Sequence, residues 1–319
     1  MTRPVLILLG LLILAVPLSL LAGRVWIDPF AAELPYAAVI LGELRLPRAA
    51  LALIVGAGLG ASGAAMQGYL RNPLADPGLF GIAPGAALGA VLSFYTGMAV
   101  QPFALPAFAL AGAAGAMALL ALIAGRTGGI ALFTLAGMMI ASLTGALTSL
   151  AISLSPNPFA LSEIVTWLMG ALTDRGWREV WIAAPPVLLG ILLLKLAGRG
   201  LDALTLGEAA ARSLGVEPGR LQALMVLGVG LTVGAGVAVA GIIGFVGLIV
   251  PHLLRPFTDH RPSALIVPSA LAGALLLLVA DCLCRILPMA SELRLGIALS
   301  LLGAPFFLAL LVAMRREAA

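Results

Sequence analysis

Apolar blocks of about 20 residues follow one another along almost the whole chain, separated by short stretches rich in charge, glycine or proline. A bilayer core about 30 Å thick is crossed by a helix of about 20 apolar residues, so these blocks predict membrane-spanning helices. Because 62% of the 319 residues are hydrophobic and only 10% are charged, little sequence is left for a water-soluble domain. A transmembrane β-barrel needs alternating apolar and polar residues, which these blocks lack. The predicted fold class is therefore all-α, in a polytopic membrane protein.

We expect about ten spans within a single transmembrane domain over residues 1–319. The spans are predicted near residues 4–23, 49–70, 78–98, 102–124, 130–154, 180–197, 221–240, 242–254, 264–287 and 295–314. The segment 242–254 is too short to cross the bilayer, so we expect a broken helix that neighbouring protein shields from lipid. Gly241, Gly244 and Gly247 recur at every third position there, which predicts a flat helix face open to close packing.

Charge predicts the orientation of the chain in the membrane. If the N-terminus is cytoplasmic, eleven of the 18 Lys and Arg residues fall on the cytoplasmic side, as the positive-inside rule requires. Both termini are then cytoplasmic. The basic residues are scattered rather than gathered in a stripe, which argues against nucleic acid as a partner. Cys282 and Cys284 lie two apart in an apolar helix and point to different sides, so we expect packing residues rather than a disulfide.

Residues 71–78, Arg-Asn-Pro-Leu-Ala-Asp-Pro-Gly, are too patterned to be a simple connection. The two prolines fix φ and remove hydrogen-bond donors, which predicts a rigid reversal at the inner surface. One interpretation is an ordinary tight turn. The other is a cytoplasmic gate, in which Asn72 and Leu74 narrow the inner end of a pathway.

The longest cytoplasmic loop, about 198–220, is predicted to hold a short amphipathic helix. Its expected features are an N-terminal cap at Thr205 or Asp202, a charged pair one turn apart at Glu208 and Arg212, and a stop at Gly215. Its expected apolar side consists of Leu204, Ala211 and Leu214. Such a helix suits docking onto a cytosolic partner, and lying on the lipid headgroups is the alternative.

Charged residues also gather at the predicted outer ends of two spans. Arg45 and Arg48 precede the second span, and Asp281, Arg285, Glu292 and Arg294 lie between the last two. Asp281 and Arg285 are one turn apart and can neutralise each other. Alternatively, exposed arginines receive carboxylates of an external protein, because a guanidinium pairs with a carboxylate through two hydrogen bonds.

Several kinds of chemistry have no signal in this sequence. The sequence contains no Walker-type lysine loop and no paired nucleophile and base. His252 and His260 lack the accompanying carboxylate spacing that is typical of zinc sites. We therefore expect neither a catalytic nor a metal site. An ion-coupled secondary transporter would need two related broken helices, and only one is predicted. The ion-coupled class is therefore less favoured.

Six motifs occur in order and carry a resemblance to a known family. They are Leu-Arg-Leu-Pro-Arg (44–48), Gly-Ala-Ala-Met-Gln-Gly (63–68), Asn-Pro-Leu-Ala-Asp-Pro-Gly (72–78), Leu-Gly-Glu (206–208), Gly-Phe-Val-Gly-Leu-Ile-Val-Pro-His (244–252) and Gly-Ala-Pro-Phe-Phe (303–307). From about residue 40 to 312 the chain resembles the permeases of type II ATP-binding-cassette importers for ferric siderophores, haem and vitamin B12. Two stretches depart from the family pattern, Glu292-Leu293-Arg294 and the second gate stretch at Ile130-Ala131.

The resemblance implies an assembly in the bacterial inner membrane. Its expected partners are a second permease copy, two cytosolic ATPases that hold ATP and magnesium, a periplasmic binding protein and membrane lipid. The permease itself binds no cofactor and is not an enzyme. The implied sites are binding-protein docking at Arg45, Arg48 and Arg285, an inner gate at Asn72 and Leu74, and ATPase coupling at Thr205, Leu206, Gly207, Glu208, Arg212, Ser213, Leu214 and Gly215.

The implied function is import by alternating access without chemistry on the cargo. We expect an iron complex, either a ferric siderophore or haem, because that cargo prevails in the family. Vitamin B12 is the alternative, since no residue of the sequence identifies a ligand.

Overall fold

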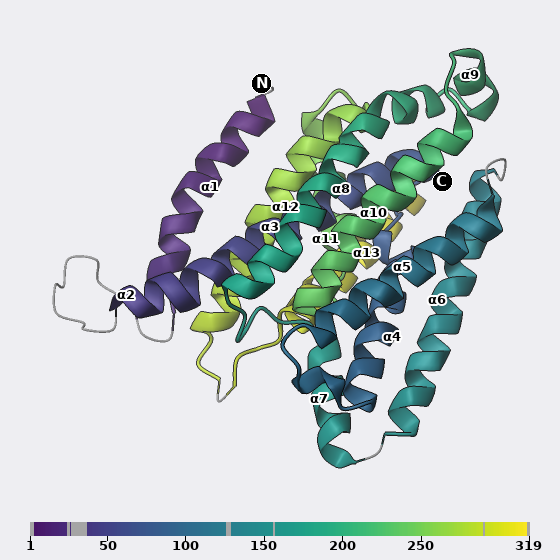
Figure 1. Cartoon of the computed structure of the whole chain (residues 1–319). Coiled ribbons are helices and arrows are strands. Elements are labelled where there is room, and N and C mark those ends of the chain that lie inside the picture. The colour runs from purple at the N-terminus through teal and green to yellow at the C-terminus, as the bar shows by residue number, and fades with distance from the viewer. Residues whose placement is uncertain are drawn as a thin grey trace.

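The computed structural model describes residues 3–23, 26, 37–125, 129–155, 157–289 and 291–317, and this part of the chain forms helices without a β-strand (Figure 1). The long helices are α1 (Arg3–Leu21), α3 (Leu46–Leu70), α5 (Ala104–Ala124), α6 (Ile130–Ser153), α8 (Trp177–Leu204), α10 (Pro218–Ala240), α12 (Pro262–Ile286) and α13 (Leu295–Glu317). The shorter elements are α2 (Ala37–Val39), the π-helical η1 (Ile40–Arg45), η2 (Pro77–Phe80), α4 (Ile82–Tyr95), η3 (Met98–Val100), α7 (Pro158–Leu168), α9 (Glu208–Ser213), α11 (Val246–Leu254) and η4 (Arg255–Phe257).

The predicted all-α polytopic architecture is confirmed. Within the described ranges, eight helical stretches are long and apolar enough to cross a membrane, one of them the continuous stretch Ala37–Leu70. The shorter apolar helices α4 and α11 account for the remaining two predicted segments. Each apolar block of the sequence therefore became a helix.

One boundary was predicted wrongly, and one helix was missed. The second span begins at Ala37 rather than at 49, because α2, η1 and α3 form one continuous helix that carries the charged residues expected in a loop. Helix α7 was not predicted at all, although Asn157 caps it through Ala160 N–H (2.9 Å) and Pro158 occupies its first turn. Asparagine followed by proline is a typical start signal of a helix.

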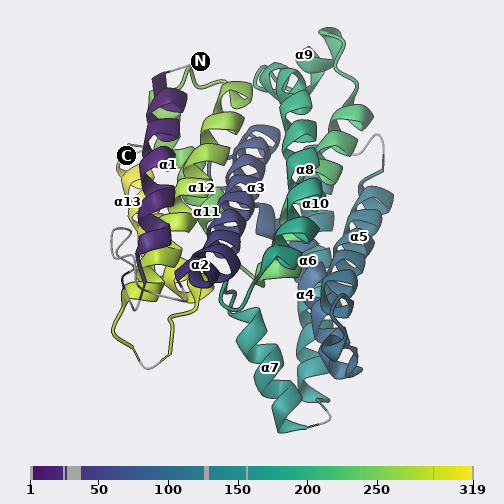
Figure 2. The same ribbon diagram turned by 60° about the vertical axis from the view of Figure 1, so that its left-hand side comes forward.

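Helix α3 lies at the centre of the bundle, between α12 and α8 (Figure 2). Its glycines let neighbouring backbones approach closely: a Cβ at Gly56 would overlap the backbone of Gly273 on α12, and a Cβ at Gly63 would overlap Gly247 on α11. Small residues at helix contacts are the usual means of association in lipid. Glycine contacts of the same kind join α4 to α5, where Gly112 lies against the backbones of Gly85 and Gly89.

The predicted broken helix is confirmed between α10 and α11. Gly241 ends α10 with φ +72°, the backbone is not helical up to Phe245 (φ +67°), and α11 then runs for 9 residues. The first six residues of α11 are buried, so protein shields this segment as expected. The flat face of three glycines was wrong, because Gly241 and Gly244 precede the helix and only Gly247 lies within it.

Backbone hydrogen bonds stitch this break to two neighbouring segments. Ala171 N–H, in the link between α7 and α8, donates to Ala240 O (2.8 Å), and Gly296 N–H at the start of α13 donates to Gly170 O (3.1 Å). A Cβ at Gly170, Gly241 or Gly296 would overlap a backbone carbonyl oxygen of the junction. Glycine is therefore needed at these three positions for the segments to meet.

The two ends of the bundle carry different elements. Helix α9 projects at one end, and α2 and α7 lie at the opposite end (Figures 1 and 2). Helix α1 begins and α13 finishes at the end that carries α9. The start of α1 and the finish of α13 therefore lie at the same end of the bundle, as the even number of predicted spans requires.

Candidate functional site

The candidate coupling segment, residues 205–215, is a compact turn and helix that projects from the end of α8 (Figure 1). Gly207 adopts φ +100°, a conformation that favours glycine, and it redirects the chain into α9. Gly215 (φ +84°) ends the helix: its N–H donates to Arg212 O (2.9 Å), and the next residue, Val216, donates to Ala211 O (3.0 Å). This pair of bonds is the Schellman motif, so the predicted stop at Gly215 is confirmed.

The predicted caps of this helix were wrong. Thr205 donates its hydroxyl to Asp202 O (2.7 Å), which closes the end of α8 rather than opening α9. The Asp202 carboxylate accepts from Ser263 N–H (2.9 Å) and from the Ser263 hydroxyl (2.6 Å), so it caps α12 instead. Asp202 therefore has a long-range partner on α12, and Thr205 has a local partner at the end of α8, so neither caps α9.

The apolar side of the segment divides into a buried and an exposed part. Leu204 and Ala211 are buried against the bundle, whereas Leu206 and Leu214 are 68% and 64% exposed. The three residues of the predicted apolar side therefore differ in environment, because Leu204 and Ala211 are buried and Leu214 is exposed. Two large exposed leucines on one small projecting element form a surface suited to a protein partner.

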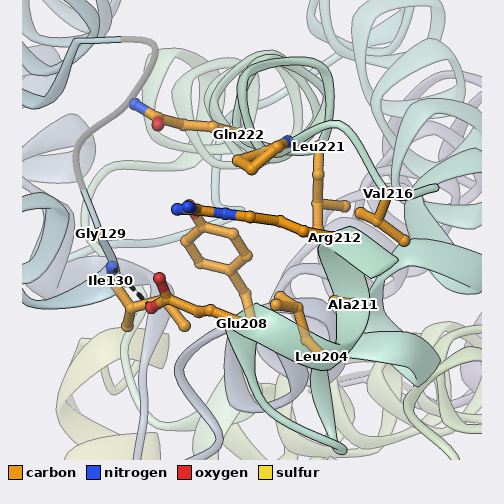
Figure 3. A pocket seen from close by; sticks show the side chains of 11 residues that line it. Gly129, Ile130, Leu204, Glu208, Ala211, Arg212, Val216, Leu221 and Gln222 are labelled. Carbon is orange, nitrogen blue, oxygen red and sulfur yellow. Dashed lines mark hydrogen bonds between the residues drawn. The ribbon is translucent and has the colours of Figure 1, made fainter. Parts of the chain in front are cut away.

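Glu208 does not form the predicted contact with Arg212. Its carboxylate turns instead toward the start of α6 and accepts from Ile130 N–H (3.3 Å; Figure 3). Gly129 lies beside the same carboxylate. Sequence spacing gave no sign of this contact, because the two residues are 78 positions apart.

The candidate gate loop, residues 71–78, is folded by its own polar groups. Arg71 ends α3 in the left-handed conformation (φ +50°), and the Asn72 side chain accepts from Leu74 N–H (2.9 Å). Asp76 accepts from Gly78 N–H (2.8 Å); burial raises the pKa of this carboxyl, and the bond to Gly78 opposes that rise. The chain reversal predicted for this loop is confirmed, and the rigidity expected from the prolines stays a prediction. Whether Asn72 and Leu74 also form a gate stays a prediction.

The predicted docking arginines are neither free nor fully exposed. Asp281 is buried, and it pairs with Arg48 (2.9 Å) and with Arg285 (3.2 Å), whose side chains are 12% and 6% exposed. Arg48 also pairs with Glu292 (2.9 Å). The alternative interpretation, structural pairing of Asp281 with Arg285, is thus confirmed, and the exposure of Arg48 and Arg285 was predicted wrongly. A buried carboxylate without a cationic partner is destabilising, so Arg48 and Arg285 pair with Asp281 inside the protein.

Arg45 also has internal partners. Its guanidinium donates to Leu20 O (2.7 Å) and Leu21 O (2.8 Å), so it closes the C-terminal end of α1. Basic side chains commonly bind the last carbonyls of a helix in this way. The docking role of the three arginines stays a prediction that these contacts do not favour in this conformation.

A groove that the sequence analysis did not predict lies at the end of the bundle that carries α7. It has a volume of about 430 Å³ and is lined by α7 residues including Glu163 and Trp167, and by Asp174, Arg175 and Arg294. Burial lowers the pKa of the Arg175 guanidinium. The helix-start signal at Asn157 and Pro158 would have revealed α7 and hence this groove.

Histidine and cysteine do not gather into a metal site in the described part of the chain, where no three His, Cys, Asp or Glu side chains come close enough to hold an ion. His252 packs edge-on against Phe306, with ring centroids 5.9 Å apart. Cys284 is buried and Cys282 is half-buried, both as free thiols. The prediction that the two cysteines are packing residues is thereby confirmed.

A helical membrane bundle with a half-helix at its centre and a small projecting helix at one end defines a membrane transport subunit. Residues 6–313 match the FecCD transport family, and the chain belongs to that family.

The relatives of the chain are membrane transport components. It is 40% identical over 311 residues to the vitamin B12 import system permease protein BtuC of Escherichia coli O9:H4 (strain HS), covering 96% of this chain and 94% of that protein. It is 40% identical over 285 residues to the ABC transporter permease protein YvrB of Bacillus subtilis (strain 168), covering 87% of this chain and 80% of that protein. The chain is accordingly an ABC importer permease of this type, a transport component without catalytic activity of its own.

Solved structures agree with the fold. An inward-facing structure described as a metal-chelate type ABC transporter superposes with a TM-score of 0.89 at 33% identity, covering 97% of this chain and 98% of that one. PsaBC from Streptococcus pneumoniae in complex with Fab matches with a TM-score of 0.57 at 20% identity, covering 87% of this chain and 91% of that one. The second likeness concerns the fold alone.

Proposed function

We propose that this permease imports vitamin B12 or a related corrinoid. The observation that carries the proposal is the 40% identity to BtuC, which extends over 96% of this chain. At the sequence level an iron complex was preferred and vitamin B12 was the alternative. Similarity to vitamin B12 permeases along nearly the whole chain supports the alternative better.

The proposed assembly follows from the same similarity. Two copies of the chain, each acting as one permease domain over residues 1–319, pair in the bacterial inner membrane with two ATPases and a periplasmic binding protein. The end that carries α9 and both termini faces the cytoplasm, where the coupling segment seats in an ATPase. The outer end, with α7 and the groove beside it, receives the binding protein. ATP and magnesium are held by the ATPase subunits.

The proposed mechanism is alternating access. The binding protein releases its cargo at the outer end, between the two copies. ATP binding moves the coupling segments, and the inner and outer ends then open in turn. The 71–78 loop closes the inner end, with Asn72 and Leu74 narrowing it. Selectivity rests with the binding protein.

An iron chelate is the second candidate cargo, favoured by the structural likeness to a metal-chelate type transporter at 33% identity. An ion-coupled carrier is less favoured, since it requires two symmetry-related broken helices. The described residues contain one such break in a long apolar stretch, between α10 and α11.

Transport in proteoliposomes tests the cargo. The permease is reconstituted with its ATPase, and binding protein loaded with radiolabelled cyanocobalamin or with a ferric siderophore is added. We expect ATP-dependent uptake of cyanocobalamin at least tenfold above that of the ferric chelate. The reverse preference would replace the corrinoid by an iron complex. Uptake driven by an ion gradient without ATP would remove the importer interpretation altogether.

A second prediction concerns the seating of the ATPase. We expect Leu206→Ser combined with Leu214→Ser to weaken co-purification of the ATPase at least tenfold, because burial of one leucine contributes about 1.5–3 kcal/mol and 1.4 kcal/mol is a tenfold change. Both side chains are mostly exposed, so the variant permease should remain monodisperse in detergent. Leu206→Met with Leu214→Met keeps the apolar surface and serves as the control. Unchanged co-purification would place the ATPase elsewhere.

A further inference from the structure

Glu208 links the candidate coupling segment to helix α6. It is the first residue of α9, and its carboxylate accepts the N–H of Ile130, the first residue of α6, at 3.3 Å (Figure 3). The first amide groups of a helix have no acceptor within that helix, and the N-terminal end carries a partial positive charge. A carboxylate from another element satisfies both needs of α6 at once.

The first turn of α6 also packs against the residues on either side of the 71–78 loop. Phe133 is buried there and packs against Tyr69 at the end of α3, with ring centroids 5.2 Å apart, and against Phe80, also at 5.2 Å. Phe80 ends η2 (Pro77–Phe80), the short helix that begins within the 71–78 loop. The start of α6 is therefore the place where the coupling segment and the candidate gate loop meet the same element.

One face of α6 packs along its length against α4, α5 and η2. Another face exposes Leu135 (57%), Met139 (72%) and Leu143 (55%) within the described chain. A displacement applied at the first turn of α6 therefore acts on a helix that is packed on one face only.

From this geometry we propose that Glu208 is a positioning residue of the transport cycle: its carboxylate fastens α9 to α6, so that a displacement of the coupling segment becomes a displacement of α6. The proposal rests on the proposed importer function. A simple cap would only stabilise the permease. A mechanical link, in contrast, determines how much transport each hydrolysed ATP produces.

The test compares Glu208→Ala, Glu208→Gln and Glu217→Ala in the complete transporter with its binding protein. Glu217 is an exposed carboxylate at the start of α10 and provides the matched control. We expect Glu208→Ala to lower the ratio of cargo transported to ATP hydrolysed at least tenfold. Glu208→Gln should fall between, because an amide oxygen still accepts the hydrogen bond without the charge. Glu217→Ala should match wild type.

Hydrogen exchange gives a second readout that does not depend on transport. In wild type, we expect ATP binding to change amide exchange both in α9 and in residues 130–133. In Glu208→Ala the response of α9 should persist, and that of 130–133 should disappear. An unchanged response at 130–133, or transport and hydrolysis that fall together, would overturn the link. If wild type hydrolyses ATP but moves no cargo, the proposed function fails instead, and the exchange result still decides the link.

Discussion

Asp281→Ala is expected to lower the free energy of unfolding by about 3–5 kcal/mol, because it leaves two buried guanidinium groups without their shared carboxylate. Asp281 is 1% exposed, and its partners Arg48 and Arg285 come from α3 and α12. Arg48 keeps Glu292 as a partner after the substitution, but Arg285 loses its carboxylate. Equilibrium unfolding in mixed detergent micelles measures the change.

Asp259→Ala is the matched control for this substitution. Asp259 also pairs with an arginine at 2.9 Å, yet the two side chains, on Arg261 and Asp259, are 69% and 48% exposed. Solvent screens such a pair, so its loss should cost less than about 1 kcal/mol. If the two variants lose stability equally, the buried network does not hold these ends of α3 and α12 together as the geometry implies.

Gly112→Ala is expected to destabilise the permease by about 1–3 kcal/mol, the typical cost of adding a carbon to a filled core. A Cβ at this position of α5 would overlap Gly85 O and the Cα of Gly89 on α4. Both obstacles are backbone atoms, so the two helices must separate to make room. The apparent melting temperature in detergent should fall accordingly. It is measured from the loss of the monodisperse peak on heating.

Gly115→Ala provides the comparison on the same helix, one turn away. A Cβ there meets nothing within 4 Å, so the substitution is expected to be neutral or to stabilise by up to about 1 kcal/mol, since alanine favours the helix over glycine. Destabilisation of equal size at both positions would mean that close contact between α4 and α5 is not the reason for Gly112.

The spans were predictable because the length and apolarity of a block decide whether it crosses a bilayer. The break before α11 was predictable too, since a short block rich in glycine cannot cross alone. The start of the second span was not predictable from the sequence. Arg45 and Arg48 look like loop residues until their partners are known, and Arg48 is paired with residues 233 and 244 positions away.

The candidate coupling segment shows the same division between local and long-range information. Its stop at Gly215 follows from backbone conformation alone and was predicted correctly. The partners of Asp202 and Glu208 lie on α12 and α6, which sequence spacing cannot place. Helix α7 is a different case, because its signals at Asn157 and Pro158 are local and were overlooked.

The junction at the break has a consequence for how sequences of this kind diverge. The bonds that join Ala171 to Ala240 and Gly296 to Gly170 are made by the backbone, so they place no demand on side-chain chemistry. Only the absence of a Cβ is required, at 170, 241 and 296. Selection on this junction should therefore act on three glycines and leave the side chains around them free to diverge in sequence without loss of the architecture.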